Sequence, residues 1–213
     1  MKNFSKDYLN ILKNELKGIN LTRILDQDEF YYKQILDSVL PIESSELILK
    51  ELNNRKIILD IGFGGGFPLL PLGYKFPSFK CIGLESKNKK VEAVRKITKL
   101  LNLKNIEVFH KRIEDVFIDV EVVITFKAVG EVNKMLKSIH TNKSIYVCFY
   151  KGPNFFEKEG MEPLIKGWKL VEKREVTIPG TEGRLFLVYK NHNVPHGTQA
   201  KNKINLVKLS ELL

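Results

Sequence analysis

Three glycines separated by single residues follow an acid a quarter of the way along the chain. Asp60 precedes Gly62, Gly64 and Gly66, and the apolar run 56–59 before it has the character of a strand. Glycine lets the backbone approach a ligand closely, because it has no Cβ and tolerates φ > 0. At the end of a parallel strand, such a loop is where nucleotide-like cofactors bind. The spacing therefore predicts a cofactor loop between a strand and a helix.

Two further residues narrow the choice of cofactor. Dinucleotide enzymes follow the pattern G-x-G-x-x-G, but Phe67 takes the position of the last glycine here. The pattern instead suits a cofactor without a pyrophosphate, such as S-adenosylmethionine (SAM). Glu85 ends a second strand-like run 19 residues after Gly66, where an acid accepts hydrogen bonds from ribose hydroxyls. An ordinary glycine-rich turn with a nearby surface glutamate is the alternative, and the order of these features argues against it.

Composition sets the broad class of the protein. The 213 residues suit one domain of ordinary size, with 43% hydrophobic and 28% charged residues. No run approaches the ~20 apolar residues of a membrane helix, and the first residues lack the apolar segment of a secretory signal. Cys81 and Cys148 lie in apolar runs and are expected to be small buried side chains, not a disulfide. We therefore expect a cytoplasmic protein.

The positive charge of the chain is localised. The formal net charge is +10, and residues 87–112 carry nine basic residues against two acids. Such a patch is typical of a polyanion partner such as RNA, although a merely solvated helix face is the alternative. The helix predicted there turns apolar residues to the sheet and lysines to solvent. The lysines expected to contact RNA phosphates are Lys87, Lys89, Lys90, Lys96 and Lys99.

The pattern of elements predicts an α/β fold. Apolar stripes predict helices in the first 54 residues, the second of them stopped by Pro41. Strands are expected at 56–61, 79–85, 106–110, 120–126, 144–150, 168–177 and 183–190, and helices near 68–76, 87–102, 129–139 and 155–166. Alternating β and α predicts a mostly parallel sheet, and the short final connection predicts an antiparallel terminal hairpin. This is the layout of a Rossmann-like class I SAM-dependent methyltransferase. The expected parts are a helical cap (1–54), a SAM-binding domain (55–190) and a C-terminal extension (191–213).

Several segments resemble the RsmG/GidB family of methyltransferases, over about residues 18–190. The matching segments are Asn20-Leu21-Thr22, Ile35-Leu36-Asp37-Ser38, the loop 58–68 with Pro71-Leu72, Glu85-Ser86 with Lys89-Lys90, Asn105-Ile106-Glu107, Arg112-Ile113-Glu114, Tyr150-Lys151-Gly152 and Glu182-Gly183-Arg184. The resemblance implies methyl transfer from SAM to N7 of a guanine in 16S rRNA. It also implies that Gly62, Phe67, Ile113 and Glu114 line the cofactor pocket.

The chain departs from the family pattern at three positions. Gln34 stands where the family usually has His, Leu69 where it has a second glycine, and Lys127 where it has Arg. Lys127 ends the fourth strand-like run and faces the ligand crevice of such sheets, so we expect it beside cofactor and target base, as the catalytic residue. Asp37, from its own helix pattern alone, is expected on the helix surface.

The expected chemistry requires no general base. Guanine N7 has a free lone pair at neutral pH, so catalysis rests on proximity and orientation. No metal or triad motif occurs, and we expect no metal, no membrane contact and a monomer acting on 16S rRNA or the small subunit. Three alternatives stay open: a small-molecule SAM methyltransferase, an RNA- or ribosome-binding protein of weakened activity, and an NAD-dependent oxidoreductase. Phe67 and the terminal hairpin oppose the last.

Overall fold

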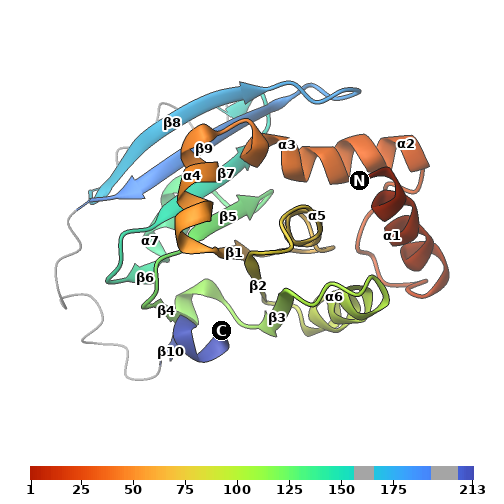
Figure 1. Cartoon of the computed structure of the whole chain (residues 1–213), viewed down its shortest axis with the longest axis horizontal. Coiled ribbons are helices and arrows are strands. Elements are labelled where there is room, and N and C mark those ends of the chain that lie inside the picture. Colours follow the sequence, from red (N-terminus) through yellow and green to blue (C-terminus); the bar gives the residue numbers. More distant parts are fainter. Residues whose placement is uncertain (156–165, 193–205) are drawn as a thin grey trace.

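The computed structural model describes residues 1–155, 166–192 and 206–213, which form a sheet covered by helices (Figure 1). In this part of the chain, seven strands form one sheet in the order β3-β2-β1-β5-β7-β9-β8. The strands are β1 (Ile57–Ile61), β2 (Lys80–Glu85), β3 (Ile106–His110), β5 (Val123–Lys127), β7 (Tyr146–Lys151), β8 (Trp168–Val176) and β9 (Arg184–Asn191). The chain winds outward from β1 through β2 to β3, and then returns to β5 on the other side of β1. Ligands bind at such a reversal, outside the carboxyl ends of the strands.

The directions of the strands confirm the predicted fold class. β1 pairs in parallel with β2 and with β5, so that Asp60 lies opposite Gly83 on one side and Thr125 on the other. β2–β3 and β5–β7 are also parallel. β9 runs antiparallel to both β7 and β8, which gives the terminal hairpin predicted from the sequence.

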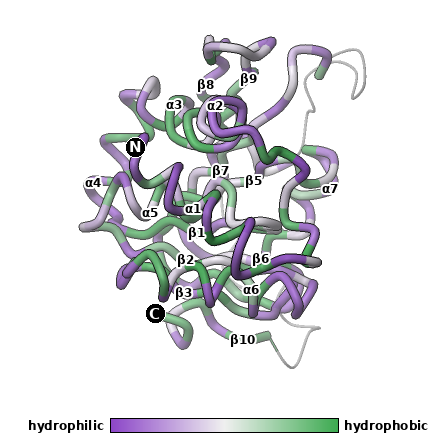
Figure 2. Tube along the Cα trace, turned by 90° about the vertical axis from the view of Figure 1, so that its right-hand side faces the viewer, coloured by the Kyte–Doolittle hydropathy of each residue, from purple (hydrophilic) through white to green (hydrophobic). Residues whose placement is uncertain are grey.

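Helices cover both faces of the sheet. They are α1 (Lys2–Asn14), α2 (Gln27–Phe30), the π-helical segment η1 (Tyr31–Leu36), α3 (Asp37–Glu43), α4 (Glu46–Arg55), α5 (Leu69–Lys75), α6 (Asn88–Leu100), the short 3-10 turn η2 (Ile113–Asp115) and α7 (Val132–Lys137). The N-terminal helices, α5 and α6 share one hydrophobic cluster with one face, whereas α7 packs on the opposite face. β1 runs as a hydrophobic segment through the middle of the molecule (Figure 2).

The predicted stop at Pro41 is wrong, because the helix continues through it. α2, η1 and α3 follow one another without a break from residue 27 to residue 43, and Pro41 lies inside α3. Proline removes one backbone donor in this position. Val39 and Ile42 flank it and are buried, at 1% and 0% exposure, so packing on the sheet offsets the missing hydrogen bond.

A second, smaller sheet was not predicted from the sequence. Its strands β4 (Val116–Ile118), β6 (His140–Thr141) and β10 (Val207–Lys208) are too short for an alternating pattern, and they pair in parallel in the order β10-β4-β6. The 3-10 turn η4 (Leu209–Leu212) follows β10 and buries Leu209 completely. The last residues of the predicted C-terminal extension thus return to the core. The helix expected at 155–166 lies almost entirely outside the described residues.

The remaining predictions from composition concern cysteines and membrane helices. Cys81 and Cys148 are free thiols at 0% exposure, as expected from their apolar runs. Within residues 1–155, 166–192 and 206–213, no helix has the length and apolar character needed to span a membrane.

Gly66 is a loop position where an added side chain meets both an unfavourable φ and close neighbours. Its φ is +91°, and a Cβ there would lie 2.6 Å from the Tyr8 hydroxyl oxygen and 2.8 Å from a Leu70 methyl. We expect Gly66→Ala to lower the free energy of unfolding by about 1–3 kcal/mol, from backbone strain and overpacking. Urea unfolding measures this change. Gly152→Ala is the control, since nothing lies within 4 Å of that position, and equal losses in both variants would contradict the explanation.

Candidate active site

The glycine-rich loop connects β1 to α5 through three residues in the left-handed region. The φ angles are +69° at Gly62, +55° at Gly64 and +91° at Gly66. The carbonyl of Phe63 accepts hydrogen bonds from the amides of Gly66 and Phe67, at 2.7 and 3.0 Å, which closes a tight turn. Other residues adopt such φ values only with strain. The spacing of the glycines is therefore set by the path of the backbone.

Helix α1 and the segment after it press on this loop. The Tyr8 hydroxyl, fully buried, donates a hydrogen bond to the carbonyl of Gly65, and its ring stacks on Phe67 at 5.3 Å between centroids. A Cβ on Gly65 would lie 2.5 Å from the carbonyl oxygen of Leu21. The N-terminal helices therefore form part of the site and hold the loop in place.

Glu85 joins the loop to the end of the neighbouring strand. Its Oε2 accepts a hydrogen bond from the Gly64 amide at 3.0 Å, and its Oε1 accepts one from the Lys87 amide at the same distance. The side chain is buried, at 6% exposure. The carboxylate therefore lies directly beside the backbone at the centre of the glycine pattern.

Asp60 lies beneath the loop. Its side chain is at 0% exposure, and its Oδ1 accepts a hydrogen bond from the Thr125 hydroxyl at 2.7 Å. Burial raises the pKa of this carboxyl from 3.8 to about 7, against the lowering effect of the Thr125 hydrogen bond. Asp60 does not line the cavity described below. Its contacts tie β1 to β5 under the loop.

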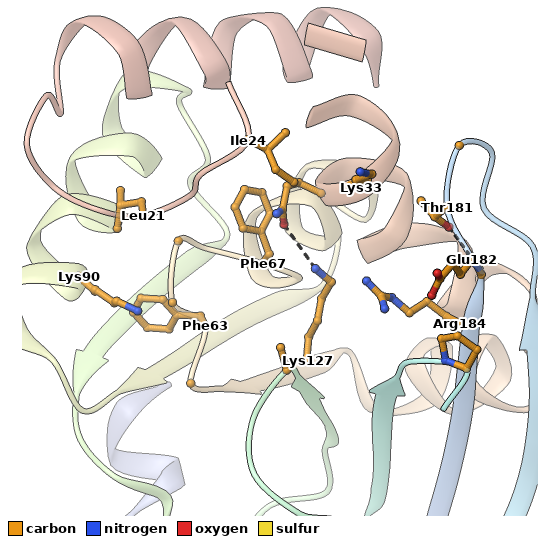
Figure 3. Close-up of a pocket in the computed structure, with 18 residues that line it drawn as sticks. Leu21, Ile24, Lys33, Phe63, Phe67, Lys90, Lys127, Thr181, Glu182 and Arg184 are labelled. Atoms are coloured by element: carbon orange, nitrogen blue, oxygen red, sulfur yellow. Dashed lines mark hydrogen bonds between the residues drawn. The ribbon is translucent and has the colours of Figure 1, made fainter. Parts of the chain in front are cut away.

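A cavity of ≈ 840 Å³ opens above the loop, at the carboxyl ends of β1 and β5. Figure 3 shows Lys127 in its middle, with Phe63, Phe67 and Lys90 to one side and Thr181, Glu182 and Arg184 to the other. The residues around the cavity come from six regions of the chain. They are Leu21, Ile24, Lys33, Gln34, Gly62, Phe63, Gly64, Gly65, Phe67, Lys90, Lys127, Ala128, Pro153, Gly180, Thr181, Glu182, Gly183 and Arg184.

A buried carboxylate holds two cations at this cavity. Asp37, at 0% exposure, accepts two hydrogen bonds from Arg184. Nε donates one at 2.6 Å, and Nη2 donates the other at 3.0 Å. The Lys127 ammonium lies 3.0 Å from the same carboxylate and 3.4 Å from Oε1 of Gln34. It also lies 5.8 Å from the centre of the Phe67 ring. Burial lowers the pKa of Lys127, and the Asp37 carboxylate opposes that shift.

This arrangement corrects the expectation that Asp37 is a surface residue. Asp37 begins α3 directly after the π-helical segment η1, and it is buried together with Ser38 and Val39. The wider turn of a π-helix shifts the buried face, so the α-helical spacing read from the sequence misplaced this acid. Arg184 matched the family pattern only loosely, and no local pattern connected it with residue 37.

The residues predicted to bind the cofactor divide into two groups. Gly62, Gly64, Phe67 and Lys127 line the cavity. The others lie around it without lining it: Asp60 beneath the loop, Gly66 within the loop, Glu85 at the end of β2, and Ile113 and Glu114 in η2, which follows the adjacent strand β3. All of these residues come from the carboxyl ends of β1, β2, β3 and β5, which are neighbours in the sheet.

The lysines predicted to bind RNA are not equivalent. Lys90 lines the cavity near Gly64. Lys87, Lys89 and Lys99 are exposed, whereas Lys96 forms a salt bridge of 2.8 Å with Glu15, just after α1. The inward residues Val91, Val94 and Ile97 are buried, as the apolar stripe of this helix predicted. The charge of Lys96 is therefore already partnered.

SAM fits the site as the residues build it. Gly62, Gly64 and Gly65 line the cavity with backbone that no side chain covers, and Glu85 offers a carboxylate beside that loop. Phe63, Phe67, Leu21 and Ile24 give the same half of the cavity an apolar lining. Residues 1–155, 166–192 and 206–213 contain no cluster of His, Cys, Asp or Glu side chains suited to a metal ion.

The strand order, the reversed β9 and the glycine loop define a Rossmann-like, SAM-dependent methyltransferase. Within that class, the family model described as "rRNA small subunit methyltransferase G" matches residues 1–184. The chain therefore belongs to this family.

Curated relatives with the corresponding name match this chain over most of their length. "Ribosomal RNA small subunit methyltransferase G" of Lactobacillus helveticus is 31% identical over 197 residues, which cover 87% of this chain and 81% of that protein. The protein of the same name from Mycoplasma capricolum is 28% identical, over 99% of this chain and 92% of its own length. The crystal structure of a SAM-dependent methyltransferase from Aquifex aeolicus is 18% identical, with a TM-score of 0.46, over 74% of this chain and 92% of that one. A likeness at that level supports no further conclusion about this chain.

We expect Glu85→Ala to weaken SAM binding by about 1.5–3 kcal/mol, because it removes charged hydrogen-bond acceptors at the loop. Calorimetric titration with SAM measures the change. Glu107→Ala is the matched control, since Glu107 lies on the neighbouring strand β3 and pairs with Lys80 at the surface. Wild-type affinity in Glu85→Ala would remove this residue from the cofactor site.

Asp60 should make stability depend on pH. Its folded pKa of about 7 lies above the usual value of 3.8, so the folded protein holds the proton more tightly than the unfolded chain. The contribution of this group to stability is therefore complete below about pH 4 and is lost as the pH rises towards 7. Asp60→Asn has no carboxyl group to ionise and therefore avoids this loss of stability. The loss is on the order of 4 kcal/mol, because one pKa unit corresponds to about 1.36 kcal/mol.

Urea unfolding of both proteins between pH 4 and pH 8 measures the difference. We expect the variant to gain stability relative to the wild type as the pH rises. Parallel stability curves over this range would contradict the raised pKa.

Proposed function

We propose that the protein transfers a methyl group from SAM to N7 of a guanine in 16S rRNA. Family membership supports the reaction class, since the matching family is that of rRNA small subunit methyltransferase G. The observation that carries the proposal for this chain is the cavity itself. It joins the glycine-rich loop to a wall that carries Lys127 and Arg184, so cofactor and an anionic substrate find suitable groups side by side.

The residues of the cavity suit a nucleophile that needs no deprotonation. SAM, when bound, supplies a methyl group on a positively charged sulfur. No histidine lines the cavity in the part of the chain that the structure describes, and the buried carboxylate Asp37 is engaged by two cations. Guanine N7 requires no general base, so these residues need only orient the base and exclude water. Proximity and orientation of this kind can supply ~7–11 kcal/mol.

The basic helix α6 and the residues around it extend the proposal to the polyanionic substrate. Lys87 and Lys89 are exposed beside Lys90 at the start of α6, and Lys99 is exposed near the other end of that helix. These lysines would contact phosphates of the rRNA, whether free or in the small subunit. Lys96 would contribute only if its bond to Glu15 opened. A protein of this kind would act in the cytoplasm, where ribosomes assemble, and we propose that it does so as a monomer without a metal.

Methyl transfer can be tested directly. The protein is incubated with methyl-labelled SAM and with small subunits or naked 16S rRNA from cells that lack this modification. We expect label in the RNA at a guanine whose N7 methylation permits chain cleavage after reduction and aniline treatment. Binding of rRNA without labelling would indicate a binding protein on this fold, and labelling of small molecules alone would contradict an RNA substrate.

Lys127→Met should lower the rate of transfer at least tenfold, equivalent to about 1.4 kcal/mol. Methionine keeps a long side chain but removes the charge beside Phe67, and Asp37 keeps Arg184 as its partner. Single-turnover labelling measures the rate, and thermal unfolding checks the fold. Lys50→Met is the control, because Lys50 is exposed on α4, which leads into the amino end of β1, away from the cavity. A wild-type rate in Lys127→Met would remove Lys127 from the site.

A further inference from the structure

The cavity extends beyond the glycine loop as far as residues 180–184. Its volume of ≈ 840 Å³ lies in the upper part of the roughly 300–1,000 Å³ that ligand pockets span. Lys127 stands between two halves of different chemistry (Figure 3). The first half has the glycine loop with Phe63 and Phe67, and the second half lies between η1 and the connection from β8 to β9.

The second half is built around an arginine with unused donors. A guanidinium carries five N–H donors, of which Nε and Nη2 of Arg184 bond to Asp37. Its Nη1 makes no hydrogen bond to any residue in the described part of the chain. The side chain is 31% exposed, so these donors face the cavity and solvent. Because Asp37 is fully buried and fixed by α3, it sets the direction in which Arg184 points.

The charges around Asp37 leave an excess of one positive charge. Asp37 balances one of the two cations, Lys127 and Arg184, and Lys33 at the rim pairs with Glu29. A guanidinium held on one edge by a carboxylate and open on the other suits a phosphate, which accepts several hydrogen bonds from the same fork. Glu182 in the same wall disfavours an anion in the adjoining space, where an uncharged base would lie.

We propose that this half of the cavity binds the target nucleotide and that Arg184, positioned by Asp37, contacts its phosphate. The inference rests on the proposed function, because it takes a guanine nucleotide as the substrate of the same cavity. It assigns the two halves to two ligands: the glycine loop to the cofactor, and the wall formed by η1 and residues 180–184 to the nucleotide.

Mononucleotide binding tests the assignment without any turnover. The protein is saturated with S-adenosylhomocysteine, so that the loop half is filled, and titrated with guanosine 5′-monophosphate or with guanosine while amide resonances are recorded. We expect the monophosphate to bind about tenfold or more tightly than the nucleoside, as charged hydrogen bonds require, with shifts at residues 180–184. Equal affinities, or no shifts at the highest soluble concentration, would overturn the proposal.

Two substitutions locate the phosphate contact. Arg184→Gln should abolish the preference for the monophosphate, and Arg184→Lys should keep part of it, since a point charge replaces the fork. Arg174→Gln is the matched control, because Arg174 lies on the neighbouring strand β8 and pairs with Glu172 at the surface. Thermal unfolding identifies a variant that fails to fold. In that case the relative affinity of the wild-type protein for guanosine 5′-monophosphate and guanosine decides whether the cavity binds a phosphate.

A preference retained in folded Arg184→Gln would overturn the role of this residue. The outcome is independent of methyl transfer. If the nucleotide binds as expected but rRNA is not labelled, the proposed reaction fails while the nucleotide site stands. If rRNA is labelled but both ligands bind equally, the reaction stands and this assignment fails.

Discussion

The arrangement of the cavity depends on one buried carboxylate. Asp37 comes from the N-terminal helices, and its partners Lys127 and Arg184 come from the ends of β5 and β9. Removing one partner from a buried ion pair is costly, but a buried pair as a whole is weak support for stability. The value of this cluster therefore lies in geometry. It fixes two long, flexible cations in one place, at the point where three parts of the chain meet.

The same N-terminal helices also fix the glycine loop. Tyr8 bonds to the Gly65 carbonyl and stacks on Phe67, while Phe30 meets both rings, at 5.6 Å from Tyr8 and 5.7 Å from Phe67. A glycine-rich backbone has more conformational freedom to lose than any other, so it requires such outside support to hold one shape. The helical segment 1–54 is thus more than a cover for the core. It supports the floor of the cavity through Tyr8 and one wall through Asp37.

The sequence predicted what depends on local pattern and missed what depends on distant contacts. Strand periodicity and the glycine spacing were sufficient for the sheet, the loop and the position of Glu85 beside that loop, because each is set by neighbours in the chain. The cluster at Asp37 joins residues 37, 127 and 184, and no pattern within a helix or strand connects them. The strands β4, β6 and β10 have two or three residues each, which is too short for any periodic signal. The helix stop predicted at Pro41 was wrong, because burial of the neighbouring side chains outweighed the local tendency of proline to end a helix.

The departures at Gln34 and Lys127 concern the same contact. Each differs from the residue that the resemblance led us to expect, and the Lys127 ammonium lies 3.4 Å from the Gln34 side-chain oxygen. An amide oxygen accepts a hydrogen bond from an ammonium at any pH, whereas a histidine there would repel it once protonated. An arginine at 127 would bring a second planar fork to a carboxylate already engaged by the fork of Arg184. With lysine, Asp37 can bind one fork and one point charge together, so the two changes form a consistent pair instead of two separate losses.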